Sequence, residues 1–415
     1  MNTEKVILAR SNLQTISIGL SLPIGSITEP SKGINSILLN HMTRSTQDKD
    51  EETLAEFLDN KGISLYTSPG RTYSTITTTC PPKNITYAIE ILQEIIGSPE
   101  FDESTINQLV QRQISQIEGM QSNADSLLGN YTRWKAAFGD DPITNHPTGD
   151  SETLQKLTPG DLEGWYQSIT KFKPKIAAVG IDINEQKMKN WGLDDLIGQF
   201  GNIAIDKIKI SGSGIDYNYR DEKSTMKSEN SYLSINLNLN TDASMLDTSD
   251  LLISLLSGGF SSRMFKEIRG KRNLSYSPYA IVNKYGNVAL ISSLLDVRPE
   301  RAEEGIQTTL RLMHDTLTEE IPKPELMRAL KVAQRITVFV SDSSSSYTNY
   351  ILSRITSGQD WEVSKIKTQL DEIAAGNWQQ EILSQWQPQN LSFAMTGEFE
   401  NLHQQWQSIA GGITV

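Results

Sequence analysis

The amino-acid sequence predicts an α+β fold with two similar, duplicated domains, each a mainly antiparallel sheet with helices packed on one face. The first observation is length, because 415 residues exceed the roughly 150 residues of an ordinary domain. The second is the apolar–polar alternation at 15–22, which is typical of a half-buried strand. The third is an internal repeat, since the second half runs through the same order of elements about 210 to 220 residues further on.

The first half combines period-two strands with amphipathic helices. Acidic residues open the helix expected at 50–58, and apolar residues line one face of the helix expected at 84–96. A long helix at 102–138 contains a break near Gly119. The expected elements are, in order, strands at 6–10 and 15–22, helices at 33–44 and 50–58, strands at 63–67 and 73–80, helices at 84–96 and 102–138, and a strand at 175–180.

The repeat sets the domain boundaries. In 57–66 and again in 268–276 a helix end runs into a strand, and each is followed by a second strand and a helix. The turn-rich stretch 211–214 marks the seam. We therefore expect an N-terminal domain at 1–205, a linker at 206–223 and a C-terminal domain at 224–415.

Composition narrows the class of function. The net charge of −12 argues against binding nucleic acid through clustered basic residues. The single cysteine, Cys80, excludes an internal disulfide and a zinc site built from cysteines. The sequence shows neither an export signal nor an apolar run of roughly 18 residues, so we expect a cytoplasmic protein without a membrane span.

Five segments carry a resemblance to a known family. They are 25–30, 33–46, 146–149, 258–269 and 274–276. With them, essentially the whole chain resembles the pitrilysin or insulinase type of zinc metallopeptidase, an inverzincin family that includes mitochondrial processing peptidase and bacterial heterodimeric homologues. The resemblance implies a processing protease fold.

The same resemblance implies that this chain has lost the zinc site. Active members carry His-x-x-Glu-His on the helix after the early glycine, and a distant Glu completes the ligand set. An alignment without gaps places Ser36, Leu39 and Asn40 at the His, Glu and His positions, with Gln116 or Ser115 near the distant Glu. None of these side chains supplies the required ligand or base, so we expect no metal and no cofactor in this chain.

Two histidines near these segments do not restore the site. His41 lacks a partner four residues earlier, because Ile37 stands there, and one imidazole does not hold zinc with useful affinity. His146 lies in a Pro/Gly turn. We interpret His41 as an ordinary helix residue and His146 as a structural one.

A second pair of residues is retained. By resemblance, Arg269 and Tyr276 keep the seven-residue spacing of an Arg/Tyr pair that faces the substrate. An Arg can hold a peptide carbonyl, and a phenol can donate to a developing oxyanion. Gly258 and Gly259 form either a tight turn or a substrate-facing loop.

Two functions fit this combination. In the first, the chain is the non-catalytic, substrate-binding subunit of a heterodimeric endopeptidase that cleaves peptides or unfolded segments. A pitrilysin-like partner with an intact His-x-x-Glu-His would supply zinc and the general base. In the second, the chain is a catalytically inactive scaffold, similar to the core proteins of respiratory complexes.

Overall fold

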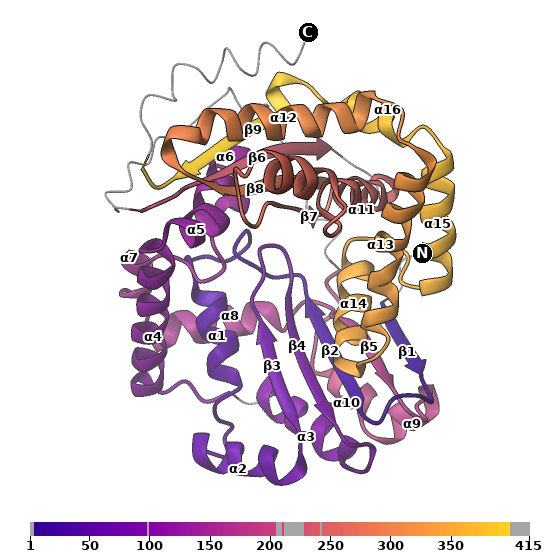
Figure 1. Ribbon diagram of the computed structural model, residues 1–415. Helices are drawn as coiled ribbons and strands as arrows, with labels where there is room; N and C mark the ends of the chain where they lie inside the picture. Colours follow the sequence, from indigo (N-terminus) through magenta and orange to yellow (C-terminus); the bar gives the residue numbers. More distant parts are fainter. Residues whose placement is uncertain (1–3, 98, 205–209, 211–227, 241–242, 399–415) are drawn as a thin grey trace. The chain divides into compact units, whose positions relative to one another are not determined.

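The computed structural model describes residues 4–97, 99–204, 210, 228–240 and 243–398 (Figure 1). The chain forms two compact units, each built around one sheet, and the expected α+β class with two similar units is confirmed. The proposed linker at 206–223 lies outside the described residues, apart from Ile210.

The first unit contains a five-stranded sheet in the order β1-β5-β2-β4-β3. All neighbouring strands are antiparallel except β1 and β5. Its main elements are β1 (Lys5–Ala9), β2 (Ile16–Leu22), α1 (Ile34–Met42), α2 (Glu51–Lys61), β3 (Ser64–Ser68), β4 (Ser74–Cys80), α3 (Ile85–Gly97), α4 (Glu103–Gln121), α7 (Ser151–Leu154), α8 (Pro159–Ile169), β5 (Lys175–Gly180), α9 (Glu185–Asn190), α10 (Leu193–Gly198) and α14 (Ser344–Thr356).

The second unit contains a four-stranded antiparallel sheet in the order β7-β8-β6-β9. Its main elements are α5 (Ala124–Leu127), the π-helical turn η2 (Leu128–Thr132), α6 (Arg133–Phe138), β6 (Ser231–Asn240), α11 (Ala243–Ser257), the π-helical turn η4 (Phe265–Lys271), β7 (Tyr279–Tyr285), β8 (Val288–Val297), α12 (Ala302–Thr318), most of α13 (Lys323–Val340), α15 (Val363–Ala375), α16 (Trp378–Leu383) and β9 (Leu391–Thr396).

The order of strands supports the internal repeat. The sequence β5-β2-β4-β3 in the first sheet corresponds to β9-β6-β8-β7 in the second. Local sequence explains most element ends. The long helix expected at 102–138 stops at Gln121, and Asn123 then caps the next helical turn by accepting a hydrogen bond from the Ser126 amide.

The compact units exchange segments across the expected boundary. Residues 118–144 belong to the second unit, and 337–361 belong to the first. In the first sheet, Gly19 and its neighbours Ser17 and Thr77 form a face of small side chains, and α14 packs on it. A Cβ atom at Gly19 would lie 2.6 Å from Leu352 Cδ1, so the glycine permits the close approach of this helix.

An equivalent arrangement occurs in the second unit. Leu128 and Ala136, from the exchanged segment, form a buried cluster with Leu294 and Ala394 of the sheet. The Thr396 hydroxyl also donates to the Ala124 carbonyl at 2.6 Å. Helices of the exchanged segments therefore cover a second face of each sheet. The sequence analysis expected helices on one face only.

The opposite face of the first sheet forms the apolar core. Ile18, Leu20 and Ile76 are fully buried there, and burial of each such side chain contributes about 1.5–3 kcal/mol. Across the described ranges, we find no helix with the length and apolar character needed to cross a bilayer.

Candidate functional site

Helix α1 carries the three positions that the resemblance assigns to the zinc motif. Ser36 and Leu39 are buried, and Asn40 is half-buried. The Ser36 hydroxyl donates to Gln113 Oε1 of α4 at 2.8 Å. A neutral hydroxyl–amide pair thus occupies the place where the resemblance would put a metal ligand and its distant partner.

Gln113, rather than Gln116, lies opposite α1. Its Nε2 atom donates to the Thr148 carbonyl at 2.7 Å, whereas Ser115 and Gln116 are exposed on α4. Helical periodicity could have identified Gln113, because it shares the buried face with Leu109 and Ile117. The spacing along the sequence alone does not show which face of α4 is buried.

This arrangement does not fit a zinc ion. Zinc sites use three or four thiolate, imidazole or carboxylate ligands, whereas Leu39 is aliphatic and the Ser36–Gln113 pair is occupied by its own hydrogen bonds. Within the part of the chain that the structure describes, no group of three or more His, Cys, Asp or Glu residues could hold a metal ion.

The two nearby histidines belong to the packed interior. His41 is fully buried, its ring stacks on Phe101 at 5.4 Å, and burial lowers its pKa. His146 Nδ1 lies 2.6 Å from Thr148 Oγ1, and burial together with the nearby Arg71 guanidinium lowers the His146 pKa to about 4. Both imidazoles are therefore neutral at pH 7.

A carboxyl group that the sequence analysis did not identify binds the backbone amides at the N-terminus of α1. The Glu29 carboxylate accepts hydrogen bonds from the backbone amides of Gly33, at 2.8 Å, and Asn35, at 3.2 Å. These amides lie at the start of the helix, where intrahelical acceptors are lacking. Burial nevertheless dominates and raises the Glu29 pKa to about 7.

A second site lies at 258–276 in the other unit, where the two glycines form a tight turn. A Cβ atom at Gly258 would lie 2.3 Å from the Ser254 carbonyl oxygen, and Gly259 has a φ angle of 105°. Both positions therefore require glycine for local structural reasons. The turn leaves the following Phe260 ring 80% exposed.

Arg269 and Tyr276 are brought into direct contact. The guanidinium carbon of Arg269 lies 4.1 Å from the Tyr276 ring centroid and 4.6 Å from that of Phe265. Phe265 in turn packs edge-on against Phe260 at 4.8 Å. These four side chains form an aromatic–arginine row, and Tyr276 at its end is 72% exposed.

The π-helical turn η4 carries part of this row. Phe265 and Arg269 both belong to it, and single π-turns of this kind are frequent at functional sites. Asn273 then takes a left-handed conformation, with a φ angle of 50°, and the chain continues to Tyr276. Asparagine adopts this conformation more readily than most non-glycine residues, and contacts from neighbouring side chains support it here.

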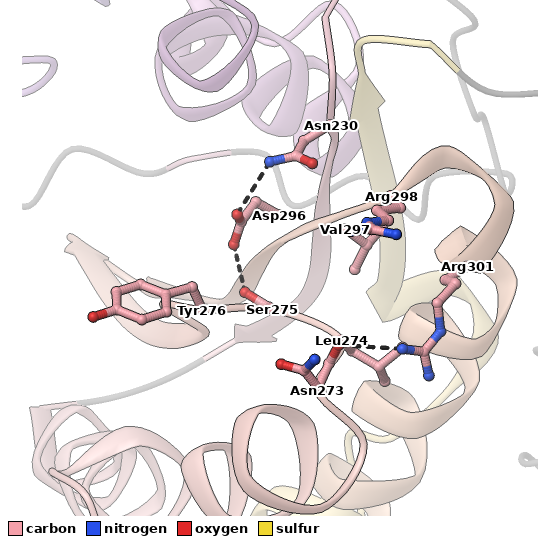
Figure 2. Close-up of a pocket in the computed structure, with 9 residues that line it drawn as sticks. All are labelled: Asn230, Asn273, Leu274, Ser275, Tyr276, Asp296, Val297, Arg298 and Arg301. Carbon is pink, nitrogen blue, oxygen red and sulfur yellow. Dashed lines mark hydrogen bonds between the residues drawn. The ribbon is translucent and has the colours of Figure 1, made fainter.

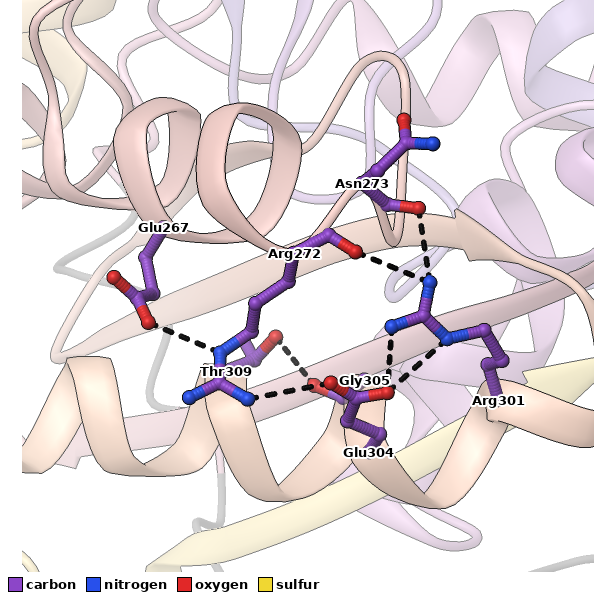
Figure 3. Close-up of polar contacts among 7 residues, drawn as sticks. All are labelled: Glu267, Arg272, Asn273, Arg301, Glu304, Gly305 and Thr309. Atoms are coloured by element: carbon purple, nitrogen blue, oxygen red, sulfur yellow. Dashed lines mark hydrogen bonds and ion pairs between the residues drawn. The ribbon is translucent and has the colours of Figure 1, made fainter.

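An ionic network supplies that support (Figure 3). Arg301 Nη1 donates to the carbonyls of Arg272 and Asn273, each at 3.1 Å. Glu304 accepts from Arg301 at 2.7 Å and from Arg272 at 3.2 Å, and these guanidinium groups lower the Glu304 pKa. Arg272 also pairs with Glu267 of η4 at 3.0 Å. Each exposed pair contributes modestly, but together they fix the loop to α12.

A pocket of about 290 Å³ lies beside the loop (Figure 2). Ser275 and Asn230 both donate to the Asp296 carboxylate within it. The residues that line the pocket are Asn230, Asn273, Leu274, Ser275, Tyr276, Asp296, Val297, Arg298 and Arg301.

The aromatic–arginine row, which is exposed at Phe260 and Tyr276, can make two kinds of contact with a bound chain. The Tyr276 hydroxyl can donate a hydrogen bond to an oxyanion, and Arg269 can present the edge of its guanidinium group to a carbonyl while its face stacks on the rings. Exposed aromatic rings also add contact area for a bound chain. Neither group requires a metal in its own unit.

The chain matches two family models and several curated proteins. Residues 5–149 match the family model described as Insulinase (Peptidase family M16), and residues 156–332 match Peptidase M16 inactive domain. Among curated proteins, the chain is similar to the "Non-peptidase homolog YmxG" of Helicobacter pylori, at 21% identity over 74% of this chain and 71% of that protein. It is also similar to the "Uncharacterized zinc protease YmxG" of Bacillus subtilis, at 21% identity over 77% and 78%.

Solved structures show the same fold. A protease from Helicobacter pylori matches with a TM-score of 0.81 and 14% identity, covering 96% of this chain and 97% of the other. A peptidase M16 inactive domain from Pseudomonas fluorescens matches with a TM-score of 0.82 and 15% identity over the same shares.

Proposed function

Because the chain belongs to the insulinase family, peptidase family M16, we propose that it is the non-catalytic, substrate-binding subunit of a heterodimeric zinc endopeptidase. Its own zinc-motif positions hold Ser36, Leu39 and Asn40. The observation that carries the proposal is the stacked pair of the half-buried Arg269 and the exposed Tyr276, which is held on a braced loop.

The division of labour follows from the two sites. Since Leu39 replaces the general base and Ser36 bonds to Gln113, this chain supplies neither metal nor base. A pitrilysin-like partner with an intact His-x-x-Glu-His would supply both. The isolated chain should therefore hold no stoichiometric zinc after dialysis and cleave no peptide.

In the complex, this chain would hold the peptide and stabilise the negative charge that develops on the scissile carbonyl oxygen. Arg269 would bind a peptide carbonyl, and the Tyr276 phenol would donate to the oxyanion formed at the scissile carbonyl. Phe260 extends the contact surface at the other end of the row. Peptides or unfolded segments suit an open surface of this kind better than compact proteins do.

The alternative is a catalytically inactive scaffold. Stacking between Arg269 and Tyr276 is an internal contact that a scaffold could also use. The 72% exposure of Tyr276 favours binding, because a residue kept for internal packing has no need of an exposed hydroxyl. Activity of the assembled pair separates the two functions.

The test is Tyr276→Phe in a complex with a pitrilysin-like partner that carries an intact His-x-x-Glu-His. Loss of one transition-state donor costs about 100- to 1,000-fold in turnover, with zinc content and assembly unchanged. Arg269→Lys should also impair turnover, because it removes the planar fork. Tyr87→Phe, at an exposed tyrosine on α3, serves as the matched control. Normal assembly and the wild-type rate in Tyr276→Phe would support the scaffold instead.

A further inference from the structure

We infer that the Phe260 ring is a subsite for a large apolar side chain of the bound peptide, and that Phe260 is therefore a specificity-determining residue. This inference rests on the proposed function, because it assumes that a peptide lies along the aromatic–arginine row. It names a substrate class, namely peptides with a leucine, phenylalanine or similar side chain close to the scissile bond.

Exposure is the first argument. Phe260 is 80% exposed and Tyr276 is 72% exposed, and no other large hydrophobic side chain in the described part of the chain is exposed to that extent. Single exposed apolar residues are normal on protein surfaces and carry no meaning alone. These two, however, are the ends of one contiguous row, which runs through Phe265 and Arg269. The greatest exposure therefore coincides with the surface that we propose to bind peptide.

The backbone holds the Phe260 ring in this exposed position. Gly258 and Gly259 form the turn that precedes it, and the Ser262 amide donates to the Gly259 carbonyl at 3.0 Å, which closes the turn. Ser262 itself is buried, as is Met264 two residues later. The chain thus returns to the interior directly after Phe260 and leaves this ring on a closed turn, where a ligand can reach it.

The two ends of the row differ in chemistry. Tyr276 presents a hydroxyl that can bind a peptide carbonyl, and Figure 2 shows this hydroxyl pointing away from the other labelled residues. The Phe260 side chain has no polar atom, so its favourable contact is burial of apolar surface. A cationic side chain over this ring would lie close to the Arg269 guanidinium, which is only one ring away, on Phe265. The Phe260 end therefore favours a large apolar side chain over a small or a cationic one.

The length of the row relates this subsite to the scissile bond. Neighbouring members of the row lie 4.1 to 4.8 Å apart, measured between ring centroids and the guanidinium carbon. An extended peptide advances about 3.3 Å per residue, so the three steps from Tyr276 to Phe260 span at most about four residues. The apolar side chain should thus lie within about four residues of the carbonyl that Tyr276 contacts.

The experiment measures binding of unlabelled peptides to the full chain by isothermal titration calorimetry, because a fluorescent label would itself be apolar. The reference is a short peptide of Gln, Ser and Ala that is blocked at both ends. In three further peptides, one central Ala is replaced by Leu, Phe or Lys. The Lys peptide distinguishes apolar burial from attraction of a cation to the ring.

We expect the Leu and Phe peptides to bind about 10-fold more tightly than the reference, as for burial of one apolar side chain against an exposed ring. The Lys peptide should bind like the reference. Phe260→Ala should abolish the preference, whereas Phe260→Leu should retain most of it. Met327→Ala, at another exposed apolar residue of the same unit, should leave it intact. Because Phe260 is exposed, its replacement should not disturb the fold.

A second measurement uses the chain in complex with a pitrilysin-like partner. The bond that is cleaved should lie within about four residues of the Leu or Phe. In Phe260→Ala this positional preference should disappear, although cleavage continues. Cleavage without regard to the position of the apolar residue would contradict the subsite.

Several binding results would overturn the inference. The subsite fails if the apolar, Lys and reference peptides bind equally, if the Lys peptide binds as tightly as the apolar ones, or if the preference survives in Phe260→Ala or is lost equally in Met327→Ala. The proposed function still stands in these cases if Arg269→Lys weakens binding of the reference. If Phe260→Ala weakens only assembly with the partner, the ring is a subunit contact instead. If no peptide binds at about 1 mM, the subsite and the proposed peptide-binding function both fail.

Discussion

The hydrogen bonds of Gln113 give the most direct test of the neutral, hydrogen-bonded pair that the structure shows beside α1. Gln113→Leu keeps a side chain of similar size but removes the acceptor for Ser36 and the donor for the Thr148 carbonyl. The expected effect is loss of stability in the first unit, because both partners remain buried without their bonds.

The magnitude follows from these two contacts. A buried polar group that loses its partner costs about 1–3 kcal/mol, and the two bonds here measure 2.8 and 2.7 Å. The added apolar surface of leucine offsets part of this cost. We expect the free energy of unfolding to fall by about 2–4 kcal/mol. Gln116→Leu, one turn further along α4 and exposed, should change it by less than about 0.5 kcal/mol.

Urea unfolding followed by far-UV circular dichroism measures both variants, with the slope of each transition compared to confirm that the same unit unfolds. The double variant Ser36→Ala, Gln113→Leu should cost less than the sum of the single changes, because the hydroxyl that lost its partner is also removed. If Gln113→Leu and Gln116→Leu lose stability equally, or neither does, the Ser36–Gln113 replacement is refuted.

Two further predictions concern packing and pH. Gly19→Val should destabilise the first unit by about 1–3 kcal/mol, because the valine side chain would collide with α14. Gly164→Ala should leave the stability unchanged, because the space around its Cβ is open. Thermal unfolding of the two variants measures the difference. Since the Glu29 pKa is raised to about 7, the folded state binds a proton that the unfolded state releases near pH 4.5. This contribution to stability is present below pH 4.5 and declines up to pH 7. Glu29→Gln should remove that decline. If the free energy of unfolding in urea depends on pH in the same way for the wild type and for Glu29→Gln, the raised pKa of Glu29 is contradicted.

Much of the fold could be predicted because its signals are local. The alternation at 15–22 became β2, and the break near Gly119 became the end of α4 at Gln121. The exchange of residues 118–144 and 337–361 between the units could not be predicted, because it depends on contacts between distant parts of the chain. Gly19 offered the one local hint, as a glycine inside an otherwise regular strand.

In the candidate site, too, some features could be predicted from the sequence and others could not. The spacing of Arg269 and Tyr276 was visible in the sequence, but their stacking depends on the π-helical turn and on Asn273, for which the sequence has no simple signature. A count along the chain leads to Gln116 or Ser115, which are exposed, whereas Gln113 contacts Ser36, because a count ignores which face of a helix is buried.

The two sites also differ in what physical chemistry requires of them. At α1, a carboxylate in the fully buried position of Leu39 would need a metal or another cation beside it. Without a metal, neutral side chains such as Ser36 and Gln113 are favoured there. The Tyr276 loop is under no such constraint, because its phenol is exposed and water can satisfy the hydroxyl without a ligand. Arg301 and Glu304 nevertheless fix this loop to α12. A fixed loop holds the exposed phenol in one place, which a binding surface requires and a packing contact alone does not, so this bracing supports binding as the role of the surface.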